Sequence, residues 1–309
     1  MRTKNIVSVL LFVMAALGCR AQEAGAQPYT ISDNVSLVVL DVSVRDPQGG
    51  YVSGLRREDF RVLEDGRPRT INQFASVDLP VTVGLVVDNS GSMLRKRPEV
   101  ITAGLAFAKE SNPQDEFFVI NFNNSVVRGL AGRTLFTDDL QALRNALYFG
   151  QPQGQTALYD AVAYALKHLE LSRQERRALI VVSDGGDNVS TTRLADLMRL
   201  IEASRATIYT VGLFDAEANE LNPRVLQRFA RASGGEYFEP DLAHIVPVLA
   251  KISKDLRNRY TLAFVPDTGD RRGVHTIRVA AQASNRKLIA HSRTSFLAEA
   301  PQAVGERGQ

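Results

Sequence analysis

Three short segments of the chain carry side chains that offer oxygen atoms. Asp88, Ser90 and Ser92 directly follow an apolar run at 81–87, in the order Asp-Asn-Ser-Gly-Ser. Thr156 ends the glycine- and glutamine-rich stretch 150–156, and Asp184 follows a second apolar run at 178–183. In an open sheet of parallel strands, ligands bind beyond the carboxyl ends of the strands. We therefore expect these side chains to meet at one edge of a sheet.

The chemistry of this set favours a divalent cation. Two carboxylates and three hydroxyls form an all-oxygen donor set, without the imidazole or thiolate that zinc and copper sites normally use. Mg²⁺ favours such donors in near-octahedral geometry at about 2.0–2.1 Å and usually keeps some water, so at least one position stays open. The sequence therefore predicts a metal site for Mg²⁺, with Mn²⁺ or Ca²⁺ as alternatives. Its ligands would be Asp88, Ser90, Ser92, Thr156 and Asp184.

The same segments resemble the metal-ion-dependent adhesion site of von Willebrand factor A domains. The likeness rests on Asp-Asn-Ser-Gly-Ser at 88–92, Gly-Gln-Thr-Ala-Leu-Tyr-Asp at 154–160 and Ser-Asp-Gly-Gly-Asp at 183–187, and it extends over residues 80–256. It implies that Ser90, Ser92 and Thr156 are hydroxyl ligands. Asp88 and Asp184 would act directly or through water. It also implies a protein partner whose acidic side chain fills the open metal position.

These residues also have structural interpretations. Serines and aspartates are common in turns and helix caps, so Ser92 or Thr156 taken alone could cap the helix that follows it. Asp187 is interpreted as a solvated turn residue, and Asp160 as a structural residue within a helix. We favour the metal site because all three segments fall at the ends, or in the connecting loops, of buried strands.

Catalytic motifs are missing from the sequence. The four histidines, at 168, 244, 275 and 291, lie outside the three oxygen-rich segments, so none is obviously placed as a general base for Ser90. Ser90 lacks the Gly-x-Ser-x-Gly elbow, and the chain has no Gly-x-x-x-x-Gly-Lys phosphate loop. We therefore predict that the protein is not an enzyme.

The segments that must position these residues alternate between strand-like and helix-like patterns. Apolar runs at 81–87, 116–122, 178–183 and 207–212 predict buried strands, with a short edge strand at 236–238. Helical periodicity is found at 101–108, 140–149, 157–169, 194–203, 225–232 and 242–256. This alternation indicates βαβ units, and so an α/β fold with a doubly wound, mostly parallel sheet.

Both flanks of this region have a β pattern instead. Residues 35–45 alternate with period two, and Asp65-Gly66 between short runs at 60–64 and 70–74 predicts a hairpin. The β pattern returns at 260–265, 276–281 and 288–293. We predict a sandwich-like β module built from 30–78 and 257–298, around an α/β domain at 80–256. The stretches 42–49, 54–66 and 259–266 resemble exported bacterial proteins described as VWFA-related.

The first 26 residues have the features of an export signal. Arg2 and Lys4 precede an apolar core at 6–17, which is too short to span a bilayer of about 30 Å. Either Ala-Gly-Ala at 24–26 is a cleavage site, or Ala-Leu-Gly-Cys at 16–19 is a lipoprotein box in which Cys19 is lipidated. Both readings predict export to the periplasm, cell surface or medium. Residues 299–309 are predicted to be a disordered tail.

The predicted function is metal-dependent protein binding or adhesion. The alternative is a structural or assembly subunit of a cell-envelope complex, in which the metal only joins three loops. A net charge of +3 does not indicate a nucleic-acid partner. Residues 257–297 hold eight Arg or Lys and two Asp, which is either a solvated β face or a contact surface for an acidic partner or anionic lipid. As a further hypothesis, the helix at 242–256 passes movement of the metal loops to the β module.

Overall fold

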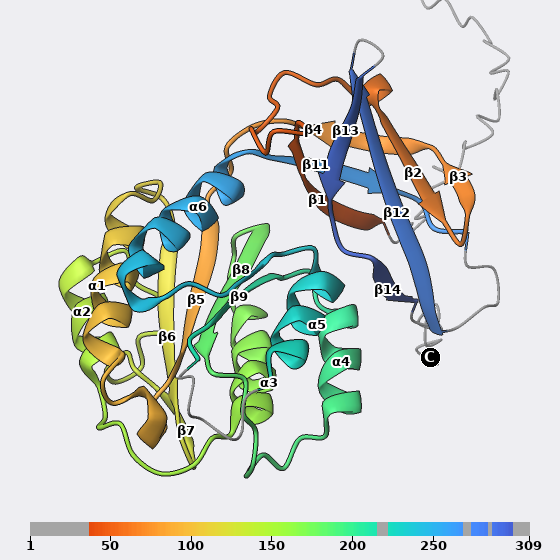
Figure 1. The fold of residues 1–309 in the computed structure, drawn as a ribbon. Helices are drawn as coiled ribbons and strands as arrows, with labels where there is room; N and C mark the ends of the chain where they lie inside the picture. Colours follow the sequence, from red (N-terminus) through yellow and green to blue (C-terminus); the bar gives the residue numbers. More distant parts are fainter. Residues whose placement is uncertain (1–36, 215–221, 268–272, 284–285, 299–309) are drawn as a thin grey trace, which may run out of the picture. The chain divides into compact units, whose positions relative to one another are not determined.

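The computed structural model describes residues 37–214, 222–267, 273–283 and 286–298. Their strands form two sheets, one of six strands and one of eight (Figure 1). The predicted export signal, both candidate processing sites and the predicted tail lie outside the described residues. Within the ranges given above, no helix is both long and apolar enough to cross a membrane.

The six-stranded sheet is mixed and carries two of the oxygen-rich segments at its strand ends. Its order is β10-β9-β8-β5-β6-β7. The bounds are β5 Val81–Asp88, β6 Glu116–Phe122, β7 Val126–Arg128, β8 Arg176–Ser183, β9 Thr207–Gly212 and β10 Tyr237–Phe238. Neighbouring strands are parallel except for β6 and β7, which are antiparallel. The five predicted strands are present. β7 is an addition, too short to produce a periodic signal.

Helices flank this sheet at all six predicted places. Their bounds are α1 Arg97–Lys109, α2 Leu140–Tyr148, α3 Leu158–Leu169, α4 Leu194–Ala203, α5 Pro223–Ser233 and α6 Ile245–Arg257. α1 contacts α2 and α6, whereas α4 contacts α3 and α5 (Figure 1). The α/β fold with a mostly parallel central sheet is therefore confirmed, and the doubly wound layout stays a prediction.

The eight-stranded sheet is antiparallel and is built from both flanks of the chain. Its order is β3-β2-β12-β13-β1-β11-β4, with β14 paired to β12. The bounds are β1 Val38–Arg45, β2 Phe60–Glu64, β3 Arg67–Arg69, β4 Ile71–Ala75, β11 Arg259–Phe264, β12 Gly273–Ala283, β13 Arg286–His291 and β14 Ser295–Ala298. β1 lies between β11 and β13, so the two flanks are interleaved in one sheet.

Two details of this sheet differ from the sequence prediction. A sandwich implies two stacked sheets, but here a single sheet curls back on itself. Phe60 lies near one end of the strand order and Phe74 at the other end, yet the centres of their rings are only 5.8 Å apart. The Asp65-Gly66 turn is a hairpin with positive φ at both residues, yet it joins β2 to β3 and not to the run at 70–74. That run becomes β4, which pairs with β11, because a local turn signal cannot reveal a distant partner.

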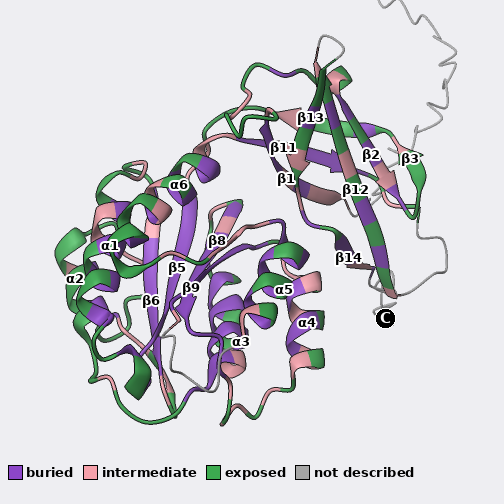
Figure 2. Ribbon diagram, viewed as in Figure 1, coloured by how far each residue is buried: buried purple, intermediate pink, exposed green. Residues whose placement is uncertain are grey.

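Each sheet has its own apolar core (Figure 2). In the six-stranded sheet every residue of β5 is buried, which explains why the run 81–87 before Asp88 is apolar except at Thr82 and Gly84. In the eight-stranded sheet, Leu40, Val42 and Leu262 belong to the apolar core, and the polar Ser43 and Arg45 that follow Val42 in β1 are buried as well.

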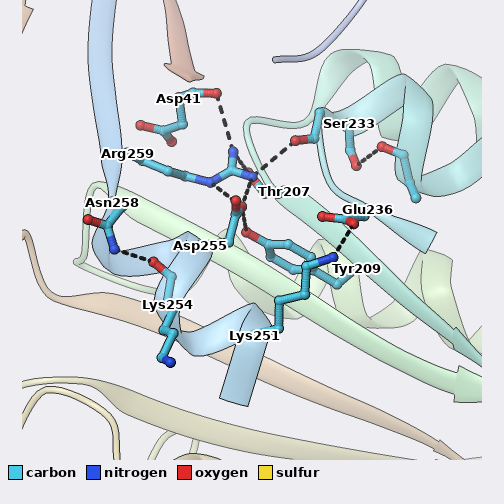
Figure 3. A network of polar contacts seen from close by, with 12 residues as sticks. Asp41, Thr207, Tyr209, Ser233, Glu236, Lys251, Lys254, Asp255, Asn258 and Arg259 are labelled. Atoms are coloured by element: carbon cyan, nitrogen blue, oxygen red, sulfur yellow. Dashed lines mark hydrogen bonds and ion pairs between the residues drawn. The ribbon is translucent and has the colours of Figure 1, made fainter. Parts of the chain in front are cut away.

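A buried network of charged side chains joins α6 to both sheets (Figure 3). Asp255 of α6 accepts hydrogen bonds from Nη2 of Arg259 at 2.6 Å, from the Tyr209 hydroxyl at 2.6 Å and from Arg45 at 3.0 Å. Arg259 also donates to the carbonyl of Gly234. These residues come from α6, β1, β9, β11 and the loop after α5, so the network fixes the end of α6 to its surroundings.

The basic stretch at 257–297 is partly used inside the protein. Arg259 is buried in the network just described. Arg293 is buried as well and donates to the carbonyls of Ser204 and Glu202 at the end of α4. Arg257 pairs with Asp115 at 3.0 Å. These three arginines therefore do not belong to a solvated β face, although sequence composition alone cannot distinguish the two situations.

Candidate metal centre

The first oxygen-rich segment turns sharply as it leaves β5. The carboxylate of Asp88 accepts the backbone N–H of Ser90 at 2.8 Å, which is the local turn that aspartate favours. A short 3-10 turn, Gly91–Met93, follows, and the fully buried Met93 side chain anchors it in the core. Ser90 is buried and Ser92 is exposed, so the segment reaches from the interior to the solvent.

Four of the five predicted ligands form a continuous chain of contacts. The hydroxyls of Ser90 and Ser92 lie 3.1 Å apart, and Ser92 donates to Oδ2 of Asp184 at 2.7 Å. Asp88 lies beside this chain through Ser90 and through Ser183, whose hydroxyl donates to Oδ2 of Asp88 at 2.6 Å. The structure thus brings the ends of β5 and β8 together as the sequence predicted.

Thr156 is held between the other two segments by backbone contacts. The N–H of Gly91 donates to the carbonyl of Gly154 at 3.1 Å, and the N–H of Gln153 donates to the carbonyl of Asn89 at 2.9 Å. On the other side, Thr156 and Asn188 exchange two hydrogen bonds, at 2.9 and 3.0 Å. These contacts place Thr156 at the same edge of the sheet, whereas the role of its hydroxyl as a ligand stays a prediction.

Helix capping does not account for Ser92 or Thr156. The residues at the cap positions of α1 and α3 are Lys96 and Ala157, and neither helix has a side-chain cap. The Ser92 hydroxyl is instead directed to Asp184. The simplest alternative interpretation of these two residues is therefore wrong.

Among the residues that the structure describes, no cationic side chain pairs with the carboxylates of Asp88 and Asp184. Asp88 is completely buried, and its hydrogen bonds come from a hydroxyl and an amide, which are both neutral. Burial raises the pKa of Asp88 to about 6, and the nearby charge of Asp184 adds to the rise. Asp184 is also buried and accepts from the Ser92 hydroxyl and the N–H of Gly186. A bound cation would offset this cost of burying negative charge.

These residues fit a hard divalent cation. In the described part of the chain, no three His, Cys, Asp or Glu side chains gather into a group that could hold a metal. The candidate centre has only two carboxylates, Asp88 and Asp184, and it depends on hydroxyls to complete its donor set. An all-oxygen set of this kind suits Mg²⁺, Mn²⁺ or Ca²⁺ and does not suit zinc or copper.

Two residues that support the centre were missed by the sequence analysis. Ser183 was placed at the end of a strand and at the start of the motif 183–187 but was given no role, whereas its hydroxyl donates to Asp88 and accepts the N–H of Gly185. Asn89 bonds through its backbone to Phe122 and Gln153, so it joins β6 to the loop before α3. The position of Ser183 next to Asp184 at a strand end was the only available signal for its role.

Two further acidic residues have structural roles. Asp160 accepts the N–H groups of Thr191 and Thr192 at 2.9 and 2.8 Å, in agreement with the structural interpretation. Asp187 is half-buried and accepts the N–H of Tyr159 and the Ser190 hydroxyl. It therefore helps to fix the start of α3 and is more than a solvated turn residue.

Comparison with known proteins identifies the α/β region. Residues 83–186 match the family model of the von Willebrand factor type A domain. The matched range contains all five candidate ligands. The chain therefore contains a von Willebrand factor type A domain. No curated protein matches the chain.

A solved structure with a TM-score above 0.5 agrees with this assignment at the level of the fold, and two further structures are similar over a smaller part of this chain. A von Willebrand factor type A protein from Catenulispora acidiphila has a TM-score of 0.52 and 13% identity, covering 77% of this chain and 73% of its own. The vWF domain of the type V pili tip protein Mfa5 from Porphyromonas gingivalis has a TM-score of 0.46 and 16% identity, covering 58% and 95%. BatB from Bacteroides thetaiotaomicron has a TM-score of 0.46 and 20% identity, covering 57% and 97%.

Proposed function

We propose that this protein binds an acidic group of a protein partner through a divalent cation, most naturally Mg²⁺. The observation that carries the proposal is the contact chain from Asp88 through Ser90 and Ser92 to Asp184. Both carboxylates are buried, and within the described ranges their hydrogen-bond donors are neutral hydroxyl and amide groups. Thr156, held at the same edge, would complete the ligand set. The outward position of Ser92 leaves the site open to a ligand from solvent.

Each residue has a distinct role in this proposal. The hydroxyls of Ser90, Ser92 and Thr156 would hold the metal, while Asp88 and Asp184 supply negative charge directly or through water. The Ser183 hydroxyl would orient the Asp88 carboxylate by donating a hydrogen bond to its Oδ2. The bound metal would offer an open coordination position to a carboxylate oxygen of the partner.

A binding role fits the described contacts better than catalysis. His168, His244 and His275 bond to the Leu135 carbonyl, Asp241 and Asp65 respectively, so these imidazoles are engaged away from Ser90. A serine nucleophile needs a base within hydrogen-bond reach. We therefore propose a non-enzymatic interaction module.

The place of action that we propose is outside the cytoplasm. The N-terminal signal supports export to the periplasm, the cell surface or the medium, and Cys19 would provide a lipid anchor if the lipoprotein box is used. The second candidate function is that of a structural subunit of an envelope complex, in which the metal only holds the three loops together. The backbone hydrogen bonds that already join the three segments support it.

Calorimetric titration of the purified protein with Mg²⁺ tests the proposal. We expect the native protein to bind the ion and the variants Asp88→Ala and Ser90→Ala not to bind it. Titrating an N-acetylated acidic peptide into the metal-loaded protein then distinguishes the two functions, because only a metal with an open coordination position can bind the peptide carboxylate. Failure of the native protein to bind any of Mg²⁺, Mn²⁺ and Ca²⁺ would refute both.

A further inference from the structure

Large apolar side chains are exposed next to the candidate metal centre. Leu94 is 60% exposed, Tyr148 55% and Phe149 50%. Single exposed apolar residues are normal on a protein surface and need no explanation. These three differ because they come from the two segments that border the metal centre, one just after Ser92 and the other just before the loop that ends in Thr156.

Hydrogen bonds hold these two segments against each other. Nη2 of Arg97 donates to the carbonyls of Leu147 and Phe149, both at 2.9 Å, so the start of α1 is fixed to the end of α2. The amide of Asn89 also donates to the carbonyl of Phe149, at 3.4 Å. Gly91, three residues before Leu94, bonds to Gly154. We name Leu94, Tyr148 and Phe149 the apolar rim, because these exposed residues come from two segments that are hydrogen-bonded to each other beside the candidate metal centre.

A groove between α1 and α2 begins about one turn of α2 away from this rim. It has a volume of about 280 Å³ and is lined by Leu105, Ala106, Lys109, Leu140, Gln141 and Arg144. Arg144 connects the groove to the rim, because its guanidinium lies 5.8 Å from the centre of the Tyr148 ring. The outward faces of α1 and α2 are exposed along this path (Figure 2).

The charge of the groove indicates what it can hold. Two cationic side chains, Lys109 and Arg144, line it together with apolar residues, and no acidic side chain does. Asp139, at the start of α2, is used as the helix cap and accepts the N–H of Ala142. A partner that combines acidic and apolar side chains would therefore match both the metal centre and the groove.

We propose that the partner is an acidic polypeptide segment that docks along α2, with one carboxylate at the metal and one apolar side chain in the groove. This proposal rests on the proposed function, because the carboxylate must reach the metal edge. Beyond the proposed function, it states that the rim, the groove and the basic residues Lys109 and Arg144 select which acidic segments bind.

The length of α2 sets the spacing that the partner needs. From Phe149 back to Leu140 the helix rises about 13 Å, at about 1.5 Å per residue. An extended segment covers about 3.3 Å per residue and so needs about four residues for this distance. The acidic residue and the apolar residue of the partner should therefore be about four or more positions apart.

Selection from a displayed library of random peptides tests this inference. The native protein is loaded with Mg²⁺, and the bound peptides are eluted with EDTA, so that only metal-dependent binders are recovered. We expect the recovered peptides to combine an Asp or Glu with an apolar residue about four or more positions away. Their affinity should fall about tenfold for Leu140→Ser and for Tyr148→Ser, because each removes apolar contact area.

The control variant is Leu171→Ser, which changes a similarly exposed leucine outside the rim and groove. It should bind the selected peptides like the native protein, and all three variants should bind Mg²⁺ normally by calorimetry. Recovered peptides without an apolar preference, or with equal affinity for Leu140→Ser, would overturn the groove as a docking site. The same holds if no peptide is recovered although Mg²⁺ binds. Absence of Mg²⁺ binding would instead refute the proposed function itself.

Discussion

Ser92 donates its hydroxyl hydrogen to Asp184 at 2.7 Å, although 92 residues separate the two along the chain. The sheet produces this contact. β5 and β8 are parallel neighbours with Val87 opposite Val182, so the residues that follow each strand leave the sheet at the same level. The juxtaposition of the candidate metal ligands is thus a consequence of strand register, and metal binding by them can be tested one side chain at a time.

Ser92→Ala should weaken Mg²⁺ binding by about tenfold or more, since even residues that only orient a metal ligand typically contribute that much. Ser92 is an exposed residue outside the apolar core, so the substitution should leave the fold intact. Calorimetry measures the effect, with Ser53→Ala, an exposed serine in the β module, as the matched control. Equal affinity in both variants would exclude Ser92 from the ligand set.

Asp88→Asn should abolish Mg²⁺ binding and yet stabilise the metal-free protein. Burial raises the pKa of Asp88 to about 6. At neutral pH the carboxylate is therefore less stable in the folded protein than in the unfolded chain, so that its charge lowers the free energy of unfolding. Removing that charge should increase the free energy of unfolding by about 1–3 kcal/mol, at roughly 1.4 kcal/mol per pKa unit. Urea unfolding in EDTA measures this change, and a decrease in stability would contradict it.

Mg²⁺ should raise the melting temperature of the native protein. A ligand present at a hundred times its dissociation constant stabilises the folded state by about 2.7 kcal/mol, which corresponds to several degrees. Thermal unfolding monitored by circular dichroism, with and without EDTA, measures the shift. The Asp88→Asn variant serves as the control and should melt at the same temperature under both conditions.

Asp255→Ala should destabilise the protein by about 3–5 kcal/mol, because it leaves Arg259 buried without its acidic partner. The exposed Asp138→Asn is the control and should change the free energy of unfolding little. Denaturant unfolding measures both. The variant also tests the hypothesis about α6, since the Asp255 contacts would carry any movement of this helix to β1 and β11.

Acid should remove the contribution that Asp255 makes to the stability of the folded protein. Burial alone would raise the pKa of this carboxyl, but Arg259 and the Tyr209 hydrogen bond outweigh it and hold the pKa well below its usual range. A depressed pKa in the folded state means that the stabilisation is complete above the unfolded value, about 3.9, and is lost as the pH falls below it. Between pH 5 and pH 3, native protein should therefore lose more stability than Asp255→Asn.

The sequence predicted the α/β region well because its signals are local. Buried parallel strands such as β5 give continuous apolar runs, and helices such as α3 give a strong 3.6-residue period. Short strands such as β7 and β14 were missed since three or four residues carry no periodicity. The predicted partner of β4 was wrong for a related reason. Its actual partner β11 lies nearly 190 positions away in the chain, where a local turn signal gives no information.

For this protein, residue type and spacing alone predicted the α/β fold, the β character of both flanks and the five oxygen-bearing candidates for a metal site. Only the tertiary structure decided how these residues are used. The register of β5 and β8 brought Ser92 to Asp184 and added Ser183 behind Asp88. Folding buries Arg259 and Arg293, which composition had placed in an apparent basic face, and pairs the partly exposed Arg257 with the buried Asp115. Both outcomes depend on distances between segments that are far apart in the chain, and local sequence patterns do not encode such distances.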